Sequence, residues 1–315
     1  MSEALVAVRF IHFASAMAVF GTGAFRLYAF AGAGAGDGRP ENAAARDALD
    51  AFLARAMMWG TVVALLSALA MVPCVGAGMA GTDSAALDPA TDATVLFGTS
   101  FGQAWCWHIG FAIVLLALCA MPRRRWQSAA SLVAALLFLA SLGWVGHAAM
   151  DFGGGRAHEL NQMVHLTAAG VWLGGLAPLG ILLHRSLRSD GAAYIPLARA
   201  ALPHFSQIGY AAVALVALTG SINAILLVGS FDALVETPYG RLLVVKIALF
   251  LTMVALALIN RFRLVLRLRD SAATPPALRA LYRSVIGEQA LGLTILAVIS
   301  VLGTWPPAIE VAMAM

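Results

Sequence analysis

Apolar stretches of about 20 residues recur along almost the whole chain, separated only by short polar segments. A helix of that length crosses the hydrocarbon core of a bilayer, whereas a barrel strand needs only about 10 residues. Backbone N–H and C=O groups in lipid must be paired within the chain, which leaves helices or closed barrels as spanning structures. The length of the runs therefore predicts an all-α fold, a polytopic membrane helix bundle with about eight transmembrane helices. We expect these helices at residues 4–31, 48–73, 97–121, 127–150, 158–184, 203–229, 239–262 and 283–304.

The composition agrees with a lipid environment and excludes several soluble classes of protein. Hydrophobic residues make up 61% of the chain and charged residues 11%, against roughly 25% charged residues in soluble domains. The net charge of +4 does not indicate a nucleic-acid partner, because the arginines are concentrated in short segments between apolar runs. The chain also lacks the Gly-Lys-Ser/Thr phosphate loop of nucleotide-binding proteins. The predicted partner is therefore the lipid bilayer, without nucleic acid or nucleotide.

The arginines predict the orientation of the chain in the membrane. The connecting segments 122–126, 185–199 and 261–283 are rich in arginine. They alternate with 151–157 and 230–238, where, taken together, acidic residues outnumber basic ones. Short loops rich in basic residues stay in the cytoplasm. We therefore expect a protein of the bacterial inner (cytoplasmic) membrane with both termini in the periplasm.

Internal matches indicate that the chain consists of two related halves. Three pairs of segments match in the same order, namely 12–21 with 165–174, 99–102 with 237–240, and 142–143 with 302–303. Convergent packing of small residues could mimic any one match, but three in order favour a duplication. The second match also places His108 opposite Lys246. We predict a parallel repeat of four plus four helices, residues 1–150 and 151–315, within one integral membrane unit.

Histidines gather in the outward-facing third of the predicted bundle. Five of the seven histidines fall in that leaflet: His12, His108, His147, His158 and His165. An ionisable residue inside a span is energetically unfavourable and is a functional candidate by default. A single histidine there more often bonds to a neighbouring serine or carbonyl group, but five in one leaflet favour a binding role.

Copper is one ligand that this histidine cluster could hold. Imidazole suits copper, zinc or iron, whereas thioether and thiol groups select Cu(I). His158 and His165 lie two helical turns apart and so share a helix face, whereas Met163 lies on another face of the same helix. Any metal site must therefore be assembled between helices. The predicted metal ligands are His12, His147, His158 and His165, with Met150, Met163 and Cys106 as auxiliary ligands.

Haem b is the alternative ligand. Bis-imidazole haem needs two histidines at equal depth on facing helices, and helix bundles build such sites in their cores. The repeat pairs His12 with His165, and His108 with Lys246, at matching depths. These four residues are the predicted cofactor-binding set if haem is present, and the protein would then transfer electrons and could act as a cupric reductase.

Several segments between residues 146 and 261 resemble those of a known family. They are Gly146-His147, Asn161-Gln-Met-Val-His165 continuing to Pro178-Leu179, Thr237-Pro-Tyr-Gly240 continuing to Lys246, and Asn260-Arg261. This set resembles the CopD-type copper resistance family of bacterial inner-membrane proteins. The resemblance implies a copper-handling protein that moves copper across the inner membrane, beside a separate periplasmic copper-binding protein. By motif position, the family's histidines correspond to His12, His147 and His165.

Three functional classes remain open from the sequence. A copper transporter is favoured by the histidine cluster and by the resemblance. A haem-binding oxidoreductase is the alternative, so whether the protein is an enzyme stays undecided. A non-catalytic membrane assembly partner is the second alternative, and it predicts that substituting the clustered histidines changes neither copper tolerance nor metal content.

Overall fold

The computed structural model describes residues 2–29, 40–122, 124, 126–150, 155–265 and 274–313. Parts of the predicted connections, namely residues 30–39, 123, 125, 151–154 and 266–273, lie outside the described residues.

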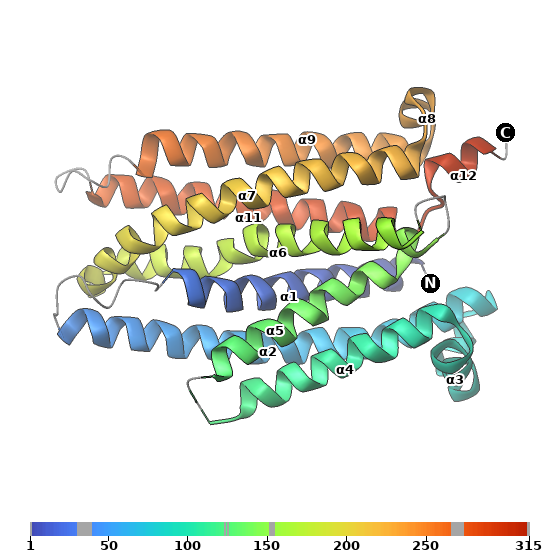
Figure 1. Cartoon of the computed structure of the whole chain (residues 1–315), viewed down its shortest axis with the longest axis horizontal. Helices are drawn as coiled ribbons and strands as arrows, with labels where there is room; N and C mark the ends of the chain where they lie inside the picture. The colour runs from blue at the N-terminus through green and yellow to red at the C-terminus, as the bar shows by residue number, and fades with distance from the viewer. Residues whose placement is uncertain are drawn as a thin grey trace.

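Eight long apolar helices run alongside one another in a single bundle (Figure 1). They are α1 (Ser2–Tyr28), α2 (Pro40–Ala80), α4 (Ser100–Ala120), α5 (Gln127–Ala140), α6 (Gly155–Ser186), α7 (Ile195–Val228), α9 (Pro238–Ile259) and α11 (Thr274–Leu302). Each is long and apolar enough to cross a membrane, α5 together with the short helical turn that follows it. The described part of the chain contains no β-strand. The prediction of a polytopic all-α membrane bundle is confirmed.

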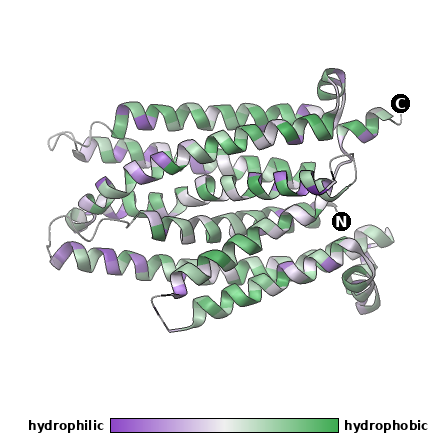
Figure 2. Ribbon diagram, in the orientation of Figure 1, coloured by the Kyte–Doolittle hydropathy of each residue, from purple (hydrophilic) through white to green (hydrophobic). Residues whose placement is uncertain are grey.

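Both termini lie at one end of the bundle, beside three short helices (Figure 1). These are α3 (Pro89–Gly98), α8 (Phe231–Glu236) and α12 (Ala308–Met313), none of which the sequence predicted. Hydrophobic residues cover most of the length of the long helices, and hydrophilic residues gather toward their ends (Figure 2). This distribution is the one expected of helices whose middle sections face lipid.

The fourth span differs from its prediction. We expected one helix over 127–150, but α5 ends at Ala140 and two short 3-10 segments follow, Ser141–Trp144 and Gly146–Ala149. Gly146 begins the second segment with a φ of 76°, a left-handed conformation that side chains disfavour. His147 therefore lies on a short turn at the end of the bundle rather than on a transmembrane helix.

Two matching sequence segments adopt the same local structure. Thr99 is the N-cap residue of α4, and Thr237 is the N-cap residue of α9. Thr99 Oγ1 accepts a hydrogen bond from Gly102 N–H at 2.9 Å, and Thr237 Oγ1 accepts one from Gly240 N–H at 3.0 Å. Each glycine also packs against the short helix before it, because a Cβ at Gly102 would lie 2.0 Å from Val95 O and one at Gly240 2.3 Å from Leu234 O. The α3–α4 and α8–α9 corners are thus built alike, which supports the proposed duplication.

Helix α6 is the central helix of the bundle. Its apolar window is 67% buried, the largest share among the eight spans. It crosses α1 at backbone contact, because a Cβ at Gly174 would lie 1.9 Å from Met17 O. Small residues at a helix crossing allow this close approach in membranes. The crossing places the two helices that carry His12 and His165 side by side.

Candidate functional site

A cavity of about 1320 Å³ lies between α1, α4, α6, α7, α9 and α11. Its wall is largely apolar, and Leu5 and Ala149 place it toward the end of the bundle that holds the termini. Its histidine, methionine and cationic lining residues include His147, His158, His165, Met150, Arg9 and Lys246. The cavity therefore brings together residues that lie far apart in the sequence and that can bind metals or anions.

His158, on the first turn of α6, is the least satisfied polar side chain in this cavity. It is only 2% exposed, and neither of its ring nitrogens makes a hydrogen bond of normal geometry with a described residue, although the side chain of Asn223 lies close by. Nearby amides are engaged with one another, since Asn223 Nδ2 donates to Gln162 Oε1 at 2.7 Å and Asn223 Oδ1 accepts from Asn161 Nδ2 at 2.8 Å. A buried polar group without a partner is unfavourable and calls for an explanation, of which an unbound ligand is one.

His165 lies two turns further along α6 and presents a free ring nitrogen. Its Nδ1 lies 2.9 Å from Thr219 Oγ1 on α7, and that hydroxyl donates its own proton to Leu215 O. The threonine therefore accepts from Nδ1–H, and the hydrogen-bond network assigns the proton of the neutral ring to Nδ1. The Nε2 of His165 is left with a lone pair, which is the form that binds a metal.

His147 presents a third unprotonated nitrogen. Its Nε2 donates to the Leu302 carbonyl at 3.3 Å, because a carbonyl can only accept, and its buried Nδ1 has no partner among the described residues. Its ring packs edge-on against Tyr239 with centroids 5.9 Å apart. Burial lowers the pKa of His147 below the ordinary value of the imidazole. The ring is therefore neutral at neutral pH and available as a ligand.

The predicted sulfur ligands separate into two groups. Met150 lines the cavity beside His147 and is 47% exposed. Met163 packs instead against α5 and its continuation, because a Cβ at Gly143 would lie 2.6 Å from Met163 Cγ. Cys106 is exposed on α4, and neither it nor Met163 lines the cavity. Of the auxiliary ligands, the structure places only Met150 with the histidines.

His12 and His108 form a separate pair outside the cavity lining. Their Nε2 atoms lie 2.9 Å apart, between α1 and α4. His12 Nδ1 lies 3.2 Å from Ala64 O and 3.0 Å from Ser67 Oγ, and His108 Nδ1 lies 2.8 Å from Ser141 Oγ. The Ala64 carbonyl requires a proton on His12 Nδ1, so His108 Nε2–H donates to His12 Nε2 when both rings are neutral. His108 Nδ1 is then an acceptor, but Ser141 Oγ lies 2.8 Å from both His108 Nδ1 and Phe138 O and has only one proton to donate.

This pairing differs from the two pairs that the sequence suggested for haem. The sequence repeat paired His12 with His165 and His108 with Lys246. In the structure, His12 is instead hydrogen-bonded to His108. His165 and Lys246 both line the cavity. Position in a repeat predicts depth, but depth does not specify which helices are neighbours in the bundle.

Two cations of the cavity lack a carboxylate partner. Lys246 makes no hydrogen bond or ion pair with any residue that the structure describes. Arg9 donates from Nε to Ser300 O at 3.2 Å, and its guanidinium occupies the space beside Gly303. Arg9 and Lys246 both line the cavity, a placement that could not be read from the sequence. Cationic groups of this kind attract anionic ligands or substituents.

No preformed metal centre is present within the described ranges. No three His, Cys, Asp or Glu side chains among those residues converge closely enough to hold a metal ion. The available ligand atoms are instead spread along the cavity, with His158 and His165 separated by about 10 Å along α6.

Comparison with known proteins identifies the family. A family model described as "Copper resistance protein D-like, N-terminal domain" matches residues 1–157, and one described as "Copper resistance protein D" matches residues 199–302. The chain is 32% identical to inner membrane protein YebZ of Escherichia coli over 96% of its length and 98% of that protein. It is 30% identical to copper resistance protein D of Pseudomonas syringae over 98% of both chains.

A further relative is larger than this chain. The copper transport protein CutJ of Bacillus subtilis is 30% identical over 80% of this chain, which corresponds to 46% of CutJ. No solved structure matches the chain. The family matches and the near full-length similarity to two relatives show that this chain is a membrane protein of the copper resistance protein D family.

Proposed function

We propose that this protein moves copper across the bacterial inner membrane by way of the large cavity. The observation that carries the proposal is His158, a buried imidazole with both nitrogens unpartnered in a cavity wall. His147 and His165 each add a nitrogen with a free lone pair in the same cavity. Copper would meet His147 and Met150 first and pass to His158 and then His165, deeper in the bundle.

The ligand chemistry favours copper among the common metals. Structural zinc takes four ligands in a tetrahedron, and no such set converges here among the described residues. Imidazole and thioether ligands suit Cu(I), and weak sites placed in series allow an ion to enter and leave. His12, Met163 and Cys106 were predicted as further ligands, but they do not line the cavity and have no step in this proposal. The Thr219 hydroxyl would orient the His165 ring for the ion through its hydrogen bond to Nδ1.

Metal binding by purified variants tests the proposal. Protein reconstituted in nanodiscs is titrated with Cu(I) and analysed for bound copper by inductively coupled plasma mass spectrometry. We expect His158→Ala and His165→Ala each to weaken binding at least about tenfold, equivalent to about 1.4 kcal/mol. The matched control is His204→Ala, because His204 also has a buried, unpartnered Nδ1 but does not line the cavity. Equal copper binding by all variants would refute the path and favour a non-catalytic assembly role.

Haem b is a second candidate ligand, supported by the size and charge of the cavity. A volume of about 1320 Å³ exceeds the needs of a single ion, and Trp172 and Phe250 contribute aromatic wall. His165 Nε2 would bind the haem iron, and Arg9 and Lys246 would pair with the two propionates. Haem would supply one-electron chemistry, which connects this candidate to the reduction of copper.

An absorption spectrum separates the two candidates. A Soret band in protein purified from haem-replete cells, lost in His165→Ala and retained in His204→Ala, would establish the haem-binding function. Protein that stays colourless after incubation with haemin would remove it and leave the copper path.

A further inference from the structure

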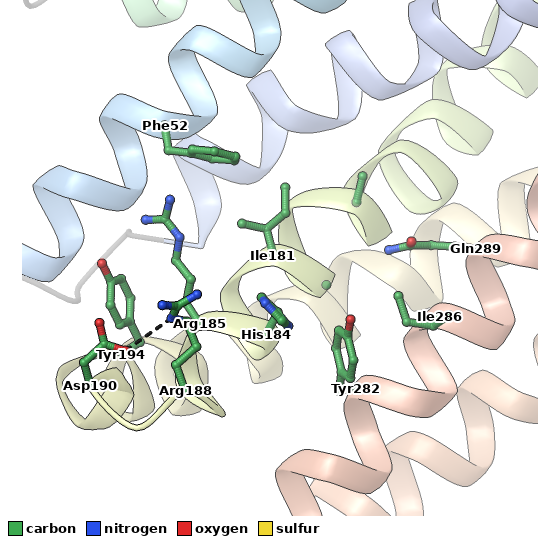
Figure 3. A pocket seen from close by; sticks show the side chains of 12 residues that line it. Phe52, Ile181, His184, Arg185, Arg188, Asp190, Tyr194, Tyr282, Ile286 and Gln289 are labelled. Atoms are coloured by element: carbon green, nitrogen blue, oxygen red, sulfur yellow. Dashed lines mark hydrogen bonds and ion pairs between the residues drawn. The ribbon is translucent and has the colours of Figure 1, made fainter.

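A second pocket, of about 770 Å³, lies at the opposite end of the bundle from the termini (Figure 3). It is formed by α2, α6, α11 and the 3-10 turn Gly191–Tyr194 that precedes α7. This is the end that the arginine pattern assigns to the cytoplasm. The pocket shares no lining residue with the large cavity, so it constitutes a separate site.

Arg185 is held in this pocket by aromatic rings rather than by an acid. Its guanidinium carbon lies 4.6 Å from the centroid of Phe52 and 5.6 Å from that of Tyr194. No described residue supplies a carboxylate or a hydrogen-bond acceptor to this guanidinium. Stacking fixes the plane of the guanidinium while leaving its N–H groups available. The side chain is therefore positioned to bind a planar or tetrahedral oxyanion bidentately.

The surrounding charges leave the pocket positive. Arg188 pairs with Asp190 at 3.3 Å, but both side chains are largely exposed, and an exposed ion pair of this kind contributes little. Arg188 can therefore leave Asp190 and bind an anionic ligand with only a small loss of free energy. His184 lies beside Tyr282 with ring centroids 5.6 Å apart on the other side of the pocket. Among the described residues, Asp190 is the only acidic one that lines the pocket.

The remaining wall is mostly apolar, with Gln289 as a polar member. Ile181 of α6 and Ile286 of α11 face the pocket from the ends of two transmembrane helices (Figure 3). An arrangement of basic groups at a helix end above an apolar wall is complementary to an amphiphile with an anionic head. Basic pockets between helices at the cytoplasmic face bind anionic lipid headgroups by this chemistry.

We propose that this pocket binds the phosphate headgroup of an anionic phospholipid, with Arg185 as the bidentate donor. Arg188 contributes a second positive charge, and an acyl chain lies along Ile181 and Ile286. A free phosphate ion shares the headgroup chemistry, but it would leave the apolar wall unused. The inference is independent of which ligand the large cavity takes.

Native mass spectrometry of the full chain tests the proposal. Detergent-purified protein is incubated with phosphatidylglycerol or with zwitterionic phosphatidylcholine, and the retained lipid is counted. We expect preferential retention of phosphatidylglycerol and about tenfold weaker retention in Arg185→Gln. The matched control is Arg283→Gln, since Arg283 is exposed on α11 but does not line the pocket. Equal retention by both variants, or equal retention of both lipids, would overturn the site.

Two further measurements keep the result interpretable. Arg185→Lys keeps the positive charge but removes the paired N–H donors of the guanidinium. This variant should fold as the wild type does and retain less phosphatidylglycerol. Arg188→Gln replaces a side chain that is 62% exposed, and it should lower retention without lowering thermal stability. Competition by inorganic phosphate that displaces the lipid completely at millimolar concentration would instead indicate a soluble phosphate ligand and would contradict the lipid assignment.

Discussion

Gly21 of α1 and Gly174 of α6 meet in backbone contact, since a Cβ at Gly21 would lie 2.2 Å from the Gly174 carbonyl carbon. The two glycines occupy equivalent positions in the matching segments 12–21 and 165–174. If the chain is a duplication, the axis that relates its halves passes through this crossing. The helices that carry His12 and His165 are thus fixed to each other at a point where no side chain can be inserted.

The first prediction concerns this crossing. Gly174→Ala places a methyl group 1.9 Å from Met17 O, so α1 and α6 must separate. We expect a loss of about 1–3 kcal/mol, the usual range for overpacking. The loss should appear as a lower midpoint of thermal unfolding in detergent. Gly209→Ala on α7 is the control, because a Cβ there meets nothing within 4 Å. A Gly174→Ala protein as stable as the control would show that the crossing is looser than described.

The second prediction concerns the His12–His108 pair. Replacing either histidine with alanine leaves a buried ring nitrogen of the other without its partner, at a cost of about 1–3 kcal/mol. The double variant should lose less than the sum of the two single losses, which a double-mutant cycle of unfolding free energies measures. Copper binding that depends on His158 should persist in all three variants. If His12→Ala loses copper binding while His108→Ala keeps it, His12 would be a copper ligand after all.

The third prediction concerns orientation. The arginine pattern and an even number of spans put both termini in the periplasm. Alkaline phosphatase fused after residue 313 should be active in cells, whereas the same enzyme inserted at Ser189 should be inactive. The reverse pattern would invert the topology and place the large cavity on the cytoplasmic side.

The fourth prediction concerns pH and the start of α3. Asp88 accepts hydrogen bonds from Thr91 Oγ1 and from the backbone N–H groups of Ala90 and Thr91, which lowers its pKa. Because the folded carboxyl has the lower pKa, its stabilisation of the helix is complete above the unfolded value and disappears as pH falls through the folded one. Hydrogen exchange at Ala90 and Thr91, corrected for intrinsic rates, should be faster in Asp88→Ala at neutral pH. The difference from wild type should vanish in strong acid, and a difference that persisted there would exclude the carboxylate as its cause.

The sequence predicted the bundle well because span length is a direct consequence of bilayer thickness. It also placed His147, His158 and His165 at one end, since position along a span gives depth. It could not pair His12 with His108, because hydropathy and repeat matching do not specify which helices are neighbours. The break after Ala140 was missed because residues 141–150 are mostly apolar, and the turn at His147 depends on the backbone conformation of Gly146. The basic pocket at the other end was missed because Phe52 and Arg185 meet only after α2 and α6 pack.

The short turn that carries His147 has a kinetic consequence. The segment Gly146–Ala149 is a single 3-10 turn outside the transmembrane helices, so it can open locally without disturbing the packed bundle. His158 and His165 lie on α6, where displacement would require the central helix itself to move. On the proposed copper path, His147 would therefore exchange the ion at the speed of a surface loop, while His158 and His165 would keep the rigidity of the core.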